Sequence, residues 1–131
     1  MDGPFQHAHG PGHVFTWVNE RPHVLEAMNM FVHAQRTERP KWTDEGVYPI
    51  YDRLIKGIDT EGDSDCFALV DVGGGIGGQL EDFRINVPNW KGRLVLQEQE
   101  SVVKQAQDIG VNDRIEVMVH DFFTPQPIKG Q

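Results

Sequence analysis

The chain of 131 residues has a single cysteine, few positive charges and no long apolar run. One cysteine, Cys66, excludes an internal disulfide and favours a small buried side chain in a reducing compartment. No window approaches the roughly 18 apolar residues of a membrane span, and the N-terminus lacks the basic and apolar regions of a signal peptide. The 12 Lys and Arg against 20 Asp and Glu give a net charge of −8, which repels the phosphates of nucleic acids and lipids. We therefore expect a cytoplasmic protein that binds neither nucleic acid nor membranes.

Residues 1–65 have the pattern of a helical segment that precedes the main domain. Glycine and proline are frequent in residues 1–18, which predicts an irregular arm rather than an early helix. Apolar residues recur every three or four positions over residues 22–35 and again over residues 47–55, which predicts two helices. This segment is expected to lie on the substrate side of the protein.

Strand and helix patterns alternate in residues 66–131. Short apolar runs predict three strands, over residues 67–72, 93–97 and 115–119. Amphipathic patterns predict two helices between them, over residues 78–87 and 100–109. This order is typical of one half of a doubly wound parallel sheet, and the chain ends before a second half. We therefore expect an α/β protein with a helical N-terminal segment and a partial Rossmann-like βαβαβ half sheet.

A glycine-rich turn follows the first predicted strand. Glycines at such a turn let backbone N–H groups and a helix N-terminus approach a ligand, because no Cβ blocks the path. The turn satisfies the dinucleotide spacing Gly73-x-Gly75-x-x-Gly78 and also Gly73-x-Gly75-x-Gly77. The spacing therefore predicts an adenosine-containing cofactor without separating NAD from the alternatives.

Acidic and aromatic residues follow the other two predicted strands. Glu98 comes after the second strand, at about the position where an acid binds ribose hydroxyls, and Glu100 is close enough to compete. Asp121 and Phe122 come after the third strand and offer an acid for an exocyclic amine and a ring for an adenine face. Because the carboxyl ends of parallel strands share one edge, we expect these side chains beside the glycine turn.

Three segments, taken in order, resemble one protein family. They are Val70–Gly77, Gly92–Glu98 and His120–Phe123, and they are similar to the cofactor-binding core of the fungal and plant-type small-molecule O-methyltransferases. The resemblance implies a class I methyltransferase fold with S-adenosylmethionine or S-adenosylhomocysteine as the cofactor. It implies these cofactor-binding residues: Asp71, Gly73, Gly75 and Gly77 at the turn, Glu98 at the ribose, and Asp121 with Phe122 at the adenine. Glu98 stands where the family usually has aspartate.

The same resemblance implies a substrate and a catalytic base. The substrate would be a small aromatic or polyketide-like natural product. Met28 and Phe31 would line its cavity, although packing of an amphipathic helix explains both residues equally well. The family's base is a histidine in a His-Asp-Trp motif, which this sequence does not contain, so we expect no catalytic residue in this chain alone. His120 has the position of a strand-end histidine rather than of a base.

Two alternatives to methyl transfer stay open. One is a non-catalytic, methyltransferase-like subunit or scaffold, in which the turn is only inherited structure. The other is a cyclase or isomerase derived from a methyltransferase, which does not transfer a methyl group. In each case the first strand would form an open sheet edge, and open edges invite pairing. We therefore expect a homo-oligomer, or association with a fuller methyltransferase chain, with contacts around residues 67–72.

Three histidines near the N-terminus, His7, His9 and His13, are close enough in sequence to raise the question of a metal site. A glycine–proline insert separates the last of them from the others, and no fourth ligand is obvious. We therefore expect a loop without a metal.

Overall fold

The computed structural model describes residues 3–37, 39–58 and 68–129. Its contacts divide the chain into two compact units, Met1–Lys41 and Trp42–Gln131. The boundary expected between residues 65 and 66 lies outside the described residues and stays a prediction. In the described ranges, no helix is long and apolar enough to cross a membrane.

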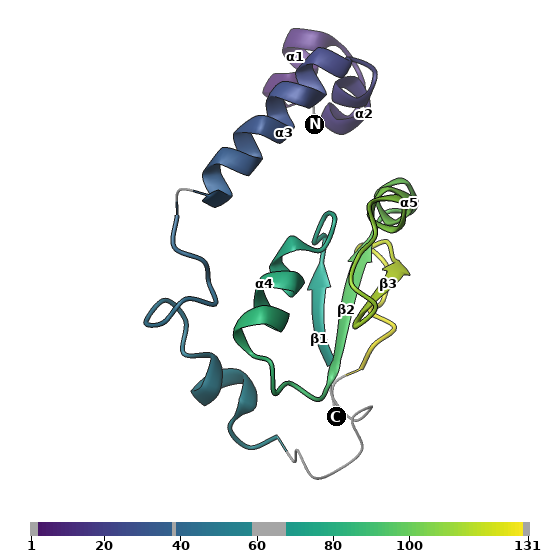
Figure 1. Ribbon diagram of the computed structural model, residues 1–131. Coiled ribbons are helices and arrows are strands. Elements are labelled where there is room, and N and C mark those ends of the chain that lie inside the picture. Colours follow the sequence, from purple (N-terminus) through teal and green to yellow (C-terminus); the bar gives the residue numbers. More distant parts are fainter. Residues whose placement is uncertain (1–2, 38, 59–67, 130–131) are drawn as a thin grey trace. The chain divides into compact units, whose positions relative to one another are not determined.

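The described residues of the first unit form three helices (Figure 1), namely α1 (Pro4–His9), α2 (Val14–Asn19) and α3 (Pro22–Thr37). The helix predicted over residues 22–35 is confirmed by α3. The irregular arm predicted for residues 1–18 is wrong, because its glycine and proline residues lie at helix ends. Pro4 stands in the first turn of α1, where its missing N–H is not needed, and Gly10 ends the helix.

An aromatic cluster joins α1 to α2. The ring of Trp17 lies 5.9 Å from the ring of Phe5 in an edge-on arrangement and 4.6 Å from the ring of His9. The guanidinium of Arg21 lies 4.2 Å from the centre of the same indole and donates a hydrogen bond to the Trp17 carbonyl oxygen. Helices of only six residues are not stable alone. Contacts around Trp17 therefore explain how two such short helices persist.

The second unit contains a parallel three-stranded sheet in the order β1-β2-β3, formed by β1 (Ala68–Val72), β2 (Arg93–Glu98) and β3 (Ile115–Val119). Helix α4 (Gly78–Asn86) connects β1 to β2, and α5 (Glu100–Ile109) connects β2 to β3 (Figure 1). The predicted βαβαβ half sheet is therefore confirmed.

Residues 47–55 form less helix than their pattern predicts. Only the five-residue π-helix η1 (Tyr51–Ile55) appears, so the expectation of a second regular helix is wrong. Pro49 has no backbone N–H to donate, so helical bonding begins only just before Tyr51. Gly57, which has a φ of 94°, lies two residues after the end of η1. The segment therefore contributes apolar side chains to the core without forming a full helix.

One face of the sheet carries the hydrophobic core. Leu94 and Leu96 of β2 are fully buried on this face, where α4 and α5 cover them. Phe83 of α4 lies in the centre, because its ring is stacked 5.5 Å from Trp42 and meets Trp90 edge-on at 5.2 Å. Other side chains complete the cluster, namely Leu80, Ala106 and Ile115, with Ile50, Leu54 and Ile55 packed against it.

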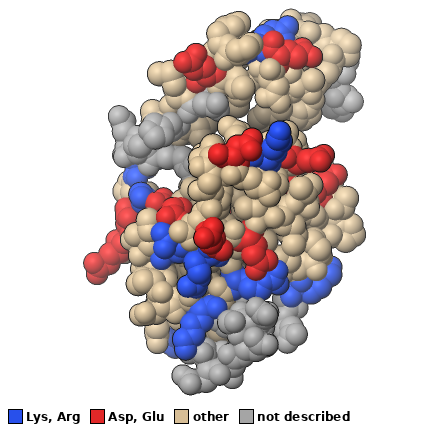
Figure 2. Space-filling model, turned by 45° about the vertical axis from the view of Figure 1, so that its right-hand side comes forward, with Lys and Arg blue, Asp and Glu red and all other residues tan. Residues whose placement is uncertain are grey.

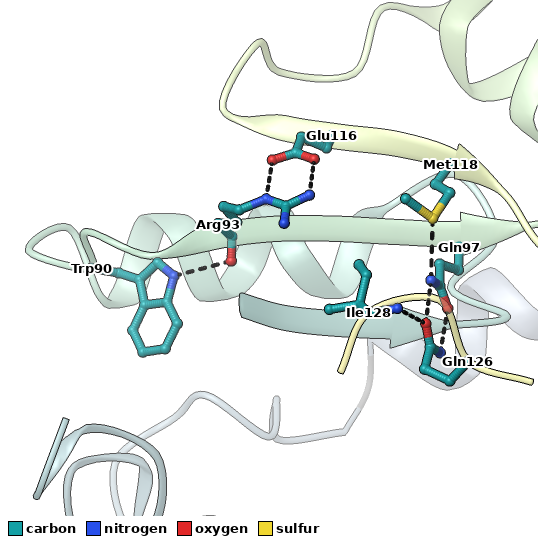
Figure 3. A network of polar contacts seen from close by, with 7 residues as sticks. All are labelled: Trp90, Arg93, Gln97, Glu116, Met118, Gln126 and Ile128. Carbon is teal, nitrogen blue, oxygen red and sulfur yellow. Dashed lines mark hydrogen bonds and ion pairs between the residues drawn. The ribbon is translucent and has the colours of Figure 1, made fainter. Parts of the chain in front are cut away.

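The opposite face of β2 is buried as well. Val95 and Gln97 alternate with the two core leucines, and their exposed fractions are 0% and 1%. The side chain of Gln97 is hydrogen-bonded to Gln126, which belongs to the segment after β3 (Figure 3). The segment after β3 therefore returns to the sheet and contacts this second face.

An ion pair joins β2 to β3. Arg93 donates hydrogen bonds of 2.8 and 2.7 Å to the two carboxylate oxygens of Glu116 (Figure 3). These hydrogen bonds hold the pKa of Glu116 below its ordinary value, against the opposing effect of partial burial. Because the folded-state pKa is depressed, the pair stabilises the fold above the ordinary carboxyl pKa. That stabilisation is lost as the pH falls through the depressed pKa.

We expect Glu116→Gln to lower the free energy of unfolding by about 0.5–1 kcal/mol at neutral pH, because both side chains are partly exposed and water screens the pair. The difference from the wild type should shrink toward zero as the solution is acidified. Urea unfolding across the pH range in which the protein stays folded measures this. The control is Glu45→Gln, at an exposed loop position. A loss of the same size in both variants would contradict a specific effect of the pair.

Candidate functional site

The glycine turn between β1 and α4 is open on its outer side. Gly73, Gly75 and Gly77 have φ values of 73°, 62° and 86°, a conformation that residues with a Cβ rarely adopt. An added Cβ at Gly73 or Gly75 would meet no other heavy atom within 4 Å. The N–H of Gly73 donates to the carbonyl oxygen of Gln97 at 2.8 Å, which fastens the turn to β2. The turn therefore offers free space on one side while it is held by the sheet on the other.

Asp71 lies beneath the turn. A Cβ on Gly74 would clash with the Asp71 carboxylate and would lie 2.6 Å from Cδ1 of Leu96. One carboxylate oxygen of Asp71, Oδ2, is buried. The structure therefore places Asp71 against the inner side of the turn, whereas the open space lies at Gly73 and Gly75.

Glu98, the last residue of β2, connects the strand to the turn. Its Oε1 accepts a hydrogen bond of 3.2 Å from the N–H of Gly75, and its Oε2 accepts one of 2.8 Å from the N–H of Gln99. The carboxylate is therefore directed toward the turn. Glu100, the competing acid in the sequence, begins α5 and has an exposed side chain.

A cavity of about 370 Å³ lies where β2 and β3 end. Its lining is acidic and aromatic, and consists of Glu98, Gln99, Glu100, Val119, His120, Asp121, Phe122 and Phe123. The structure thus brings Glu98, Asp121 and Phe122 to one cavity, and the hydrogen bond to Gly75 links this cavity to the glycine turn. A second cavity, of about 270 Å³, has a mainly apolar lining at the other end of α4. Convergent polar and aromatic groups make the first cavity the candidate site.

The loop after β3 is held in a defined turn. Oδ1 of Asp121 accepts a hydrogen bond of 3.0 Å from the N–H of Phe123, and the carbonyl oxygen of Asp121 accepts one of 2.6 Å from the hydroxyl of Thr124. The rings of Phe122 and Phe123 lie 4.6 Å apart. Phe122 is 56% exposed, so much of its ring is accessible. The acid and the ring that the sequence singles out are therefore adjacent and accessible.

Three carboxylates and one histidine line the cavity, and none of its eight lining residues is a lysine or arginine. On the protein face shown in Figure 2, acidic and basic side chains lie interspersed. The lining of the cavity itself is therefore negatively charged. Such a lining favours a cationic or uncharged ligand over a phosphate.

Met28 and Phe31 belong to α3 in the first unit. Met28 is half-buried and Phe31 is 62% exposed, so packing within the described unit does not account for most of the Phe31 side chain. Their predicted contact with a substrate stays a prediction.

Two of the three N-terminal histidines have other partners in the structure. His9 contacts Trp17, and Nδ1 of His13 accepts a hydrogen bond from the N–H of Phe15 at the start of α2. Within residues 3–37, 39–58 and 68–129, no group of three His, Cys, Asp or Glu side chains is placed to hold a metal ion.

Gln97 and Gln126 are residues of this region that the sequence analysis missed. The available signal was weak: a glutamine stands among apolar residues in β2, and another lies between two prolines after β3. Their pairing depends on the path of the chain after β3, which no local pattern specifies.

Comparison with known proteins gives a consistent group of relatives. No protein-family model matches the chain. O-methyltransferase mpaG' of Penicillium brevicompactum is 40% identical over 129 residues, which are 98% of this chain and 32% of the relative. Demethylsterigmatocystin 6-O-methyltransferase of Aspergillus flavus is 35% identical over 130 residues, 98% of this chain and 31% of the relative. The chain therefore spans about a third of the length of the curated relatives that it matches.

The chain is also similar to solved structures. LepI in complex with SAM matches 98% of this chain and 31% of its own, with a TM-score of 0.70 and 28% identity. A structure described as a pericyclic reaction enzyme matches 96% of this chain and 31% of its own, with a TM-score of 0.66 and 28% identity. These matches confirm the predicted α/β fold of the class I type. Over the residues that it spans, the chain is similar in sequence to fungal O-methyltransferases.

Proposed function

We propose that this chain binds S-adenosylmethionine or S-adenosylhomocysteine at the carboxyl edge of its sheet. The observation that carries the proposal is that Glu98, Asp121 and Phe122 line one cavity, with Glu98 hydrogen-bonded to the glycine turn. The free space at Gly73 and Gly75 supports it, because a ligand can approach the backbone there. The similarity to LepI in complex with SAM supports the identity of the cofactor.

The charge of the cavity favours this cofactor over a dinucleotide. S-adenosylmethionine carries a cationic sulfonium, an ammonium and a carboxylate, and no phosphate, whereas a dinucleotide carries an anionic pyrophosphate. Three carboxylates and no lysine or arginine line the cavity. Repulsion of the pyrophosphate therefore disfavours a dinucleotide, which the glycine spacing alone does not exclude.

Each residue has a proposed task at this site. Glu98 accepts hydrogen bonds from the ribose hydroxyls, and Asp121 accepts one from the adenine amine. The ring of Phe122 packs against the adenine face. Gly73, Gly75 and Gly77 border the methionine and ribose part, and Asp71 holds the turn from beneath. When bound, S-adenosylmethionine supplies a transferable methyl group.

We propose that the protein takes part in O-methylation of a small aromatic or polyketide-like natural product. The fungal O-methyltransferases that it resembles, including the demethylsterigmatocystin 6-O-methyltransferase, support this reaction type. Met28 and Phe31 remain the proposed substrate-lining residues.

Titration calorimetry with S-adenosylhomocysteine tests the cofactor site. We expect Glu98→Gln to weaken binding about ten- to a hundredfold, because hydrogen bonds to a charged group contribute about 1.5–3 kcal/mol. Glu100→Gln is the matched control, since this acid lines the same cavity, whereas the N–H of Gly75 in the turn donates to Glu98. We expect it to change the affinity less than about threefold. Equal losses in both variants would reject the assignment of Glu98, and no heat with the wild type would reject the cofactor.

A second candidate function is a rearrangement without methyl transfer. The observation that favours it is the similarity, at a TM-score of 0.66, to a pericyclic reaction enzyme. The mass of the product separates the two reactions, because methylation adds one methyl group and a rearrangement adds nothing.

We also propose that the protein associates with a second copy of itself or with a fuller methyltransferase chain. In the described sheet β1 has β2 as its only neighbour, and Val72 at its end is 47% exposed. An open edge strand favours pairing with another chain. A monodisperse monomer by light scattering at micromolar concentration would argue against this.

The single cysteine supports a cytoplasmic location.

A further inference from the structure

Gln97 and Gln126 form a reciprocal pair of amide hydrogen bonds (Figure 3). Nε2 of Gln97 donates to Oε1 of Gln126 at 2.7 Å, and Nε2 of Gln126 donates to Oε1 of Gln97 at 2.8 Å. Nε2 of Gln97 also lies 3.3 Å from Sδ of Met118, and Oε1 of Gln126 accepts from the N–H of Ile128. Gln97 is only 1% exposed. The pair therefore has a fixed geometry, in which the buried amide of Gln97 and the half-buried amide of Gln126 limit each other's orientation.

Two consecutive residues of β2 hold both ends of the loop that lines the cavity. At the start of the loop, the N–H of His120 donates to the carbonyl oxygen of Glu98 at 3.0 Å. At its end, Gln126 is bound to the side chain of Gln97. Between these two points lie Asp121 and Phe122, which line the cavity.

The same strand residues also hold the glycine turn. The carbonyl oxygen of Gln97 accepts from the N–H of Gly73, and the carboxylate of Glu98 accepts from the N–H of Gly75. Gln97 is therefore bonded to both walls of the proposed site, through its backbone to the turn and through its side chain to the segment after β3.

We propose that the Gln97–Gln126 amide pair is a positioning device that sets the distance between the loop of Asp121 and Phe122 and the glycine turn. The inference rests on the proposed binding of an adenosine-containing cofactor. Gln97 and Gln126 do not line the cavity, so they act on the ligand only through the loop that they hold. A site held in its binding geometry beforehand binds more tightly, because less ordering remains to be done on association.

A purely structural role makes a different prediction. Removing one amide leaves the other buried without its partner, which destabilises the fold, whereas replacing both with apolar groups of similar shape restores stability. If the pair served stability alone, ligand affinity would recover together with stability in the double replacement. If the pair positions the loop, affinity would stay low, because leucine packing does not reproduce directional hydrogen bonds.

The test compares Gln126→Leu with the double variant Gln97→Leu/Gln126→Leu. Thermal unfolding and calorimetric titration with S-adenosylhomocysteine are measured on the full chain. We expect the single variant to unfold at a lower temperature and the double variant to regain most of the loss. We expect both to bind about tenfold more weakly than the wild type, which corresponds to about 1.4 kcal/mol. The control is Gln107→Leu, at an exposed glutamine of α5 outside the cavity, and its affinity should be unchanged.

A double variant that binds within about twofold of the wild type would overturn the proposal. If the wild type does not bind the ligand, or if the double variant does not fold, amide hydrogen exchange tests the positioning role instead. The N–H groups of Phe123 and Thr124 are bonded to Asp121, and Gln126→Leu should speed their exchange about tenfold. Unchanged exchange at both positions would overturn the positioning role, whereas absent binding by the wild type would reject only the proposed cofactor.

Discussion

Replacing Phe83 with alanine should lower the free energy of unfolding of the second unit by about 3–5 kcal/mol. Phe83 is 0% exposed, and its ring contacts both Trp42 and Trp90. The substitution removes a large apolar side chain and leaves a cavity between two indoles, so burial, dispersion and aromatic contacts are lost together. Because domains are stable by about 5–15 kcal/mol, such a loss brings the unit close to unfolding.

Urea unfolding followed by circular dichroism and tryptophan fluorescence measures this effect, since two of the indoles adjoin the altered site. Phe123→Ala is the matched control, because Phe123 is 88% exposed and should change stability by less than about 0.5 kcal/mol. Similar stabilities of the two variants would show that the core is not centred on Phe83.

Replacing Gly74 with alanine should abolish cofactor binding and destabilise the fold by about 3 kcal/mol. Gly74 does not share the positive φ of its neighbours, so backbone strain is not the cause. The cause is steric: the new methyl group would fall on the Asp71 carboxylate and on Leu96, which is itself fully buried. Either the turn moves outward, into the space proposed for the ligand, or the core beneath it is displaced.

The matched control for this prediction is Gly110→Ala. Gly110 ends α5 with a φ of 90°, and an added Cβ there meets nothing within 4 Å. It should therefore cost about 1–2 kcal/mol of backbone strain without changing ligand affinity. Titration with S-adenosylhomocysteine and thermal unfolding of both variants provide the comparison. A Gly74→Ala protein that binds as tightly as the wild type would mean that the turn does not touch the ligand.

The sheet and its two helices were predictable from sequence because local signals agree there. The apolar run of β2, the glycine turn before α4 and the glycine after α5 each indicate the same element and the same boundary. The helices α1 and α2 were not predictable in this way. Their glycine and proline residues cap and end helices, and the stabilising contact between Trp17 and His9 joins separate helices.

At the candidate site, too, some features were predictable from the sequence and others were not. Glu98, Asp121 and Phe122 could be placed at one cavity because parallel strands carry their ends to one edge. The position of Asp71 beneath the turn could not be anticipated, since it depends on how Gly74 packs on the strand. The pairing of Gln97 with Gln126 depends on tertiary structure, because it joins residues 29 positions apart.

The alternation along β2 also ties ligand binding to correct strand pairing during folding. Leu96 faces the core, Gln97 faces the returning segment, and Glu98 reaches the turn. A slip of β2 by one residue would exchange these faces, so that an amide would enter the hydrocarbon core and a leucine would stand where Gln126 needs its partner. The same slip would move the carbonyl oxygen that Gly73 requires. Molecules with a misregistered sheet would therefore lose the site itself, and every molecule that binds the ligand would be one whose strands have paired in the native register.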